Sequence, residues 1–111
     1  MALIGLSVGR KYSCADSSQR EVVINGRAWD NTTSGWPKDA GRLMYRRMLV
    51  NHEVGHALGQ RHRDCTGNGR KAPVMMQQSK GMNLNGYTCK PNPWPLAREL
   101  RSLSPPSVYQ R

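Results

Sequence analysis

The chain contains no phenylalanine, and its large aromatic side chains are limited to three tryptophans and four tyrosines among 111 residues. Apolar residues make up 37% of the sequence, so a domain of this length has only a thin hydrophobic core. We therefore expect one small domain that a metal ion or a disulfide bond helps to stabilise.

Long apolar runs are also missing. The stretch 2–8 (ALIGLSV) has the length of a strand, which is too short for a membrane-spanning helix, and it lacks the flanks of a secretion signal. The sequence therefore predicts no membrane span.

Acidic side chains are scarce: 7 Asp and Glu accompany 17 Lys and Arg, which gives a formal net charge of +10. Clustered Lys and Arg can bind nucleic acids, because they release counterions from phosphates. Here the basic residues are scattered, and no helix-turn-helix, RNA-recognition or zinc-finger pattern accompanies them. We interpret the charge as a solvated basic surface, suited to acidic polymers, cell envelopes or acidic substrates, and expect no specific nucleic-acid partner.

Cysteine occurs only as Cys14, Cys65 and Cys89, and no pair has the C-x-x-C spacing of a thiolate zinc site. We favour a disulfide between Cys65 and Cys89, which closes a loop of about 25 residues and is worth roughly 3.5 kcal/mol in the chain-entropy estimate. Cys14 is then a free thiol or pairs with a cysteine outside this chain. A disulfide implies an oxidising compartment, so we expect a secreted or cell-envelope protein although no signal peptide is visible.

Histidine is rare but concentrated. All 3 histidines lie between His52 and His62, in a segment that reads H-E-x-x-H-x-x-G-x-x-H. Residues four apart share a helix face, so His52 and His56 can present imidazole nitrogens to one metal ion. Glu53 is the candidate general base for a water molecule on the open side of that ion. Gly59 can adopt left-handed backbone angles and end the helix, so that His62 returns as the third ligand.

Two alternatives to a catalytic zinc site remain. In the first alternative the histidines are ordinary core or surface residues, and their clustering is a coincidence. The correctly spaced Gly and third His make such a coincidence rare. A structural zinc site usually has four protein ligands, often thiolates, whereas three histidines leave the fourth position for water. We therefore expect one Zn²⁺ bound by His52, His56 and His62.

The extended motif resembles the signature of metzincin-type metallopeptidases, which have a second marker, a methionine in a tight turn below the metal. The segment 72–78 (APVMMQQ) is similar to that Met-turn. The better register puts Met75 in this role, with Met76 as the alternative, and an ordinary core methionine remains the plain interpretation. In the metzincin register Met75 packs its thioether beneath the imidazoles without binding zinc.

Wider parts of the chain resemble a mainly actinobacterial family of zincin-like domains, inferred to be peptidases of undefined substrate. The resemblance covers about residues 12–95, in the segments 12–14 (YSC), 22–25 (VVIN) with Trp29, 45–56 (YRRMLVNHEVGH), 65–78 (CTGNGRKAPVMMQQ) and 89–95 (CKPNPWP). Family members carry a longer region before the active-site helix. The chain thus resembles mainly the second half of such a domain, which implies a zincin-like domain over residues 1–95 with a truncated upper subdomain.

The apolar pattern predicts an α+β fold. We expect strands over 2–8 and 21–25, a turn at 16–19, a helix from about 40 to 58 capped by Asp39, and a flexible tail over 96–111. On that helix one apolar arc holds Leu43, Val50, Val54, Ala57 and Leu58, and the first two histidines lie roughly opposite, flanked by Tyr45, Met48 and Leu49. A central active-site helix should therefore have the metal on one face and a small sheet on the other, above a loop-rich lower half with the Met-turn.

Together these features predict a monomeric zinc endopeptidase that acts on a peptide or protein substrate. Glu53 would accept a proton from the zinc-activated water and return it to the leaving amine. Many metzincins place a tyrosine two positions after the turn methionine, but Gln77 lies there, and Tyr87 is only a weak candidate for stabilising the oxyanion. The alternative is a basic zinc-binding module without turnover, or an inactive fragment of such a peptidase.

Overall fold

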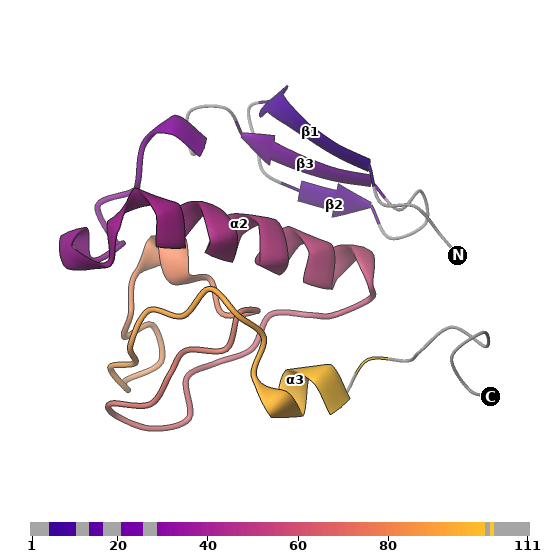
Figure 1. Ribbon diagram of the computed structural model, residues 1–111. Coiled ribbons are helices and arrows are strands. Elements are labelled where there is room, and N and C mark those ends of the chain that lie inside the picture. The colour runs from indigo at the N-terminus through magenta and orange to yellow at the C-terminus, as the bar shows by residue number, and fades with distance from the viewer. Residues whose placement is uncertain (1–4, 11–13, 17–20, 26–28, 102, 104–111) are drawn as a thin grey trace.

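The computed structural model describes residues 5–10, 14–16, 21–25, 29–101 and 103. The elements follow in the order β1 (Gly5–Arg10), β2 (Cys14–Asp16), β3 (Glu21–Asn25), the 3-10 helix η1 (Lys38–Ala40), α2 (Gly41–Ala57), the 3-10 helix η2 (Gln78–Lys80) and α3 (Ala97–Arg101). Figure 1 shows α2 in the middle, with the sheet above it and the loop-rich residues 59–96, here called the lower half, below it. Neighbours on two sides bury much of α2.

The sheet has the strand order β1-β3-β2. β1 runs parallel to β3, and β2 runs antiparallel to it. The strand expected at 21–25 forms over these residues, whereas the first strand begins at Gly5 and its expected residues 2–4 lie outside the described part of the chain. Asp16 was expected in a turn and instead ends β2, because pairing with Glu21 makes it part of the sheet; residues 17–19 of that turn are not described.

α2 spans 17 residues and begins without a side-chain cap. The expected capping role of Asp39 is wrong, because Asp39 belongs to the separate turn η1. Gly41 follows η1 with a φ of 82°, a left-handed angle that breaks the helical path between the two elements. In the described part of the chain, no helix has the length and apolarity to cross a membrane.

The side of α2 that faces the sheet differs from the expected one. An apolar cluster joins Ile24 of β3 and Trp36 to four residues of the helix, namely Tyr45, Met48, Leu49 and Ala57. Of these only Ala57 belongs to the predicted apolar arc, while Leu43 and Leu58 of that arc are 62% and 40% exposed. The sheet contacts α2 through β2 and β3, on the side of the helix where Tyr45, Met48 and Leu49 lie.

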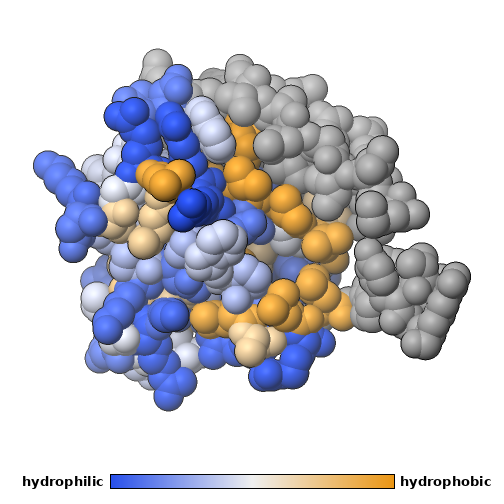
Figure 2. Space-filling view, in the orientation of Figure 1, coloured by the Kyte–Doolittle hydropathy of each residue, from blue (hydrophilic) through white to orange (hydrophobic). Residues whose placement is uncertain are grey.

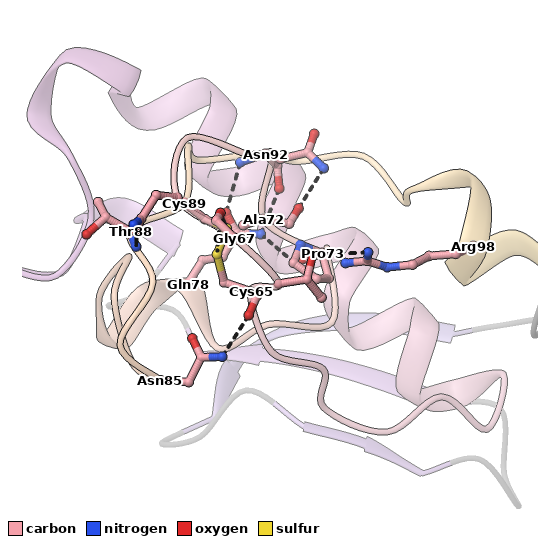
Figure 3. Close-up of a disulfide and its surroundings, with 12 residues drawn as sticks. Cys65, Gly67, Ala72, Pro73, Gln78, Asn85, Thr88, Cys89, Asn92 and Arg98 are labelled. Carbon is pink, nitrogen blue, oxygen red and sulfur yellow. Dashed lines mark hydrogen bonds between the residues drawn. A yellow bond between two sulfur atoms is a disulfide. The ribbon is translucent and has the colours of Figure 1, made fainter.

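The lower half has few regular elements and is held by a disulfide and buried amides. Cys65 and Cys89 are joined, and both pack with Ala72 and Met76 in a second apolar cluster. Beside them, fully buried Gln78 donates to the carbonyls of Pro73 and Asn92 and accepts from the Asn92 N–H (Figure 3). These bonds satisfy backbone groups that no helix or strand pairs. The side chain of Cys14 is not among those described.

Residues 96–101, at the start of the expected tail, pack against the lower half. They include α3, in which Glu99 is only 3% exposed and accepts a hydrogen bond from the Met75 N–H in the lower half. Between α2 and α3 lies an apolar hollow of about 120 Å³, lined in part by Leu58 and Leu100. Figure 2 shows apolar residues gathered over these helix ends, on the right of the view. Residues 104–111 of the expected tail lie outside the described part.

Candidate metal centre

The end of α2 reverses the chain in a way that depends on Gly59. The Gly59 N–H donates to the His56 carbonyl at 2.9 Å, and the Gln60 N–H donates to the Gly55 carbonyl at 2.8 Å. This pair of bonds is the Schellman motif, which requires a left-handed residue, and Gly59 has a φ of 90°. A Cβ at Gly59 would meet nothing within 4 Å, so its backbone angle, and not lack of space, favours glycine there.

The three histidines converge after this turn. One ring nitrogen each of His52, His56 and His62 lies within 4.8 Å of the other two. The Nε2 atoms of His56 and His62 are 3.1 Å apart, close to the separation of about 3.3 Å between two ligands in a tetrahedral zinc site with bonds of 2.0–2.1 Å. His52 is buried, His56 is half-buried and His62 is exposed, so the group opens to solvent on the His62 side.

Backbone carbonyls fix the outer nitrogens of two of these rings. His52 Nδ1 lies 2.7 Å from the Val74 carbonyl oxygen, and His56 Nδ1 lies 2.8 Å from the Gln60 carbonyl oxygen. A carbonyl only accepts, so each Nδ1 carries a hydrogen, and in the neutral ring the lone pair is then on Nε2. Metal-binding histidines usually have this bond, so the donor set fits a zinc ion.

Loss of solvent favours the neutral, metal-binding form of two of the histidines, His52 and His62. Burial is the main cause that lowers the pKa of His52 to about 4. The hydrogen bond to the Val74 carbonyl opposes this shift, and the other two histidines add to it. Partial desolvation of its ring also lowers the pKa of His62, although the residue as a whole is exposed, and His56 and Lys80 lower it further. Neutral imidazoles at neutral pH need lose no proton before they bind a cation.

Glu53 is a buried carboxyl group next to the first histidine in sequence. It is 7% exposed, and burial raises its pKa to about 7. Within the described part of the chain, no hydrogen bond or ion pair reaches its carboxylate. A carboxyl group with a pKa near neutrality can both accept and donate a proton at working pH.

Met75 lies against α2 from below, whereas Met76 packs beside the disulfide. A Cβ at Gly55 would overlap the Met75 sulfur, so Gly55 lets the thioether approach the helix within the histidine motif. The Met75 carbonyl accepts from the Arg63 N–H at 3.0 Å, which ties the residue after His62 to the segment 72–78. Of the two registers left open by the sequence, this arrangement brings Met75 to the helix.

Several residues in and around the site differ from what the sequence predicts. Tyr87 is 44% exposed, and no described contact joins it to the histidines. None of the sequence motifs assigned a role to Gly55, Gln60, Val74 or Glu99. Gly55 lies one position before His56 and carried a weak signal, since glycine is unfavourable inside a helix. The others act through or on backbone groups, which leave no side-chain pattern.

Comparison with known proteins places the chain in a family but gives no function. No curated protein and no solved structure matches it significantly. The sequence model of the family described as "Protein of unknown function (DUF3152)" matches residues 1–97, which is most of the chain. The chain therefore belongs to the DUF3152 family of proteins of unknown function.

Proposed function

We propose that this chain is a zinc-dependent peptidase domain of the metzincin type, with a zincin-like fold. The observation that carries the proposal is the convergence of three imidazoles next to a buried glutamate. His52, His56 and His62 would hold one zinc ion and leave its fourth position open. Met75 would support the rings from below, as a soft side chain that binds no metal.

The proposed chemistry divides between the metal and Glu53. When bound, zinc would activate a water molecule and polarise the peptide carbonyl of a substrate. Glu53 would accept a proton from that water as the C–O bond forms, and would deliver the proton to the leaving nitrogen as the C–N bond breaks. Its pKa of about 7 suits both transfers, because neither form is scarce at neutral pH.

The disulfide between Cys65 and Cys89 is consistent with an extracellular location. We therefore propose that the domain acts after export, in the medium or the cell envelope, as a monomer on peptide or protein substrates. Its net charge of +10 would favour acidic surfaces.

A zinc-binding module without turnover is the second candidate. It is favoured by the small size of the sheet, whose strands have 6, 3 and 5 residues. Extended substrates often bind along a strand edge, and short strands offer few backbone partners for one.

Cleavage of an unstructured protein such as casein by the zinc-loaded chain tests the proposal. Glu53→Gln should keep the zinc and the fold but lower the rate at least about 100-fold, since general base catalysis contributes roughly 10²–10⁴. Asp64→Asn is the matched control, because it removes an exposed acidic group beyond the motif and should leave the rate unchanged. A parent that holds zinc yet cleaves no unstructured substrate, or a Glu53→Gln variant as fast as the parent, would favour the non-catalytic module.

A further inference from the structure

Glu99 is a buried charged residue far from the histidines in sequence. Its Oε1 accepts hydrogen bonds from the Val74 and Leu96 N–H groups, and its Oε2 accepts from the Met75 N–H, each at 2.9 Å. A carboxylate that is 3% exposed is costly unless it is hydrogen-bonded in this way. The bonds to Val74 and Met75 anchor the Met-turn to α3.

One of these bonds connects Glu99 to His52 through a single peptide group. The Met75 N–H and the Val74 C=O belong to the same peptide group, because that peptide joins the two residues. Its N–H donates to Glu99, and its carbonyl oxygen lies 2.7 Å from His52 Nδ1. An anion on the N–H side of a peptide polarises it and makes its carbonyl a stronger acceptor. The peptide therefore relays the negative charge of Glu99 to the imidazole.

We propose that Glu99 is a positioning residue of the metal centre. Through the Val74–Met75 peptide it holds His52 as the Nδ1–H tautomer, with Nε2 turned to the metal, and it thereby sets zinc affinity. The zinc part of this inference rests on the proposed function, whereas the effect on the His52 tautomer does not.

His56 offers an internal control. Its Nδ1 partner is the Gln60 carbonyl, in the turn after α2, and that turn receives none of the three Glu99 bonds above. Loss of the Glu99 carboxylate should therefore change the tautomer of His52 and leave that of His56 as it is. General loosening of the lower half would affect both.

The test uses the full chain with its disulfide intact. In metal-free, ¹⁵N-labelled protein, the histidine ring shifts report each tautomer, and chelator competition gives the zinc Kd. Glu99→Gln removes one carboxylate oxygen, so we expect mixed His52 tautomers, unchanged His56 and a Kd raised about 10- to 100-fold.

Gln78→Met is the matched control. It removes another buried side chain that donates hydrogen bonds to backbone carbonyls, here those of Pro73 and Asn92. It should leave the His52 tautomer unchanged and shift the Kd by less than about threefold. If Glu99→Gln does not fold, Glu99→Asp is the second variant. It keeps the negative charge but places it farther from the Val74 and Met75 N–H groups, because its side chain is one methylene shorter. It should change the His52 tautomer and the zinc Kd in the same direction but by less.

A folded Glu99 variant with the parent's His52 tautomer and Kd would overturn the proposal, as would equal changes at His52 and His56. A parent that binds no zinc would contradict the proposed function instead, and the tautomer of His52 would still test the role of Glu99.

Discussion

Replacing Gly55 by alanine should force Met75 out of its place beneath α2. The new Cβ would overlap the Met75 sulfur and lie 3.3 Å from its terminal methyl carbon. Met75 is 1% exposed, and hydrogen bonds to Glu99 and from Arg63 fix its backbone, so only its side chain can shift, into the apolar hollow that Gly55 and Met75 both line. The substitution should therefore overpack the site.

Two opposing effects determine how much Gly55→Ala changes the free energy of unfolding. Alanine inside a helix is more favourable than glycine by about 1 kcal/mol. Overpacking a buried site costs about 1–3 kcal/mol, so Gly55→Ala should lower the free energy of unfolding by up to about 2 kcal/mol. After Met75→Ala, which itself costs about 2–5 kcal/mol, the overlap is gone and Gly55→Ala should instead stabilise by about 1 kcal/mol.

Urea unfolding of the metal-free parent, both single variants and the double variant, all with the disulfide intact, measures this coupling. The expected interaction energy is about 1–3 kcal/mol, with a change of sign between the two backgrounds. Additive effects, or a Gly55→Ala variant that is more stable than the parent by the full helix-propensity gain, would refute the contact between Met75 and the helix.

Three further predictions concern separate parts of the molecule. Gly59 has a φ of 90°, so Gly59→Val should add backbone strain of about 1–3 kcal/mol. The Gly59→Val variant should therefore lose zinc to a chelator sooner than Gly59→Asn, whose side chain tolerates left-handed angles better. Equal zinc retention by the two variants would show that His62 needs no left-handed turn to reach the metal. In the metal-free protein, burial raises the pKa of Glu53 from 4.5 to about 7, so its contribution to stability is full below pH 4.5 and is lost as pH rises through 7. The free energy of unfolding of Glu53→Gln, relative to the parent, should therefore rise by about 2–3 kcal/mol between pH 4.5 and 8, and a pH-independent difference in urea titrations would contradict this. Replacing Cys65 and Cys89 together by serine should lower the free energy of unfolding by roughly 3.5 kcal/mol, and a loss below about 1 kcal/mol would show that the lower half holds without its disulfide.

Local spacing was enough to predict the positions that converge in the candidate site. His52 and His56 share a face because the helix repeats every 3.6 residues, and Gly59 reverses the chain through bonds to residues within the last turn. The strand at residues 21–25 was likewise visible in its β-branched residues.

Features that depend on distant neighbours were not predictable. Glu99 binds backbone amides 24 and 25 residues away, and amides carry no signature in the sequence. β2 is a strand only because β3 pairs with it. Periodicity placed Leu43 on an apolar arc but could not tell that the sheet would cover the neighbouring side, where Tyr45 and Leu49 lie.

X-ray absorption at the zinc edge tests the proposed centre most directly, on protein loaded with zinc and freed of excess metal. We predict one zinc per chain with about three imidazole nitrogens and one oxygen at roughly 2.0–2.1 Å. Sulfur ligands at about 2.3 Å, or zinc that remains bound when His56 and His62 are both replaced by alanine, would contradict the assignment of these histidines.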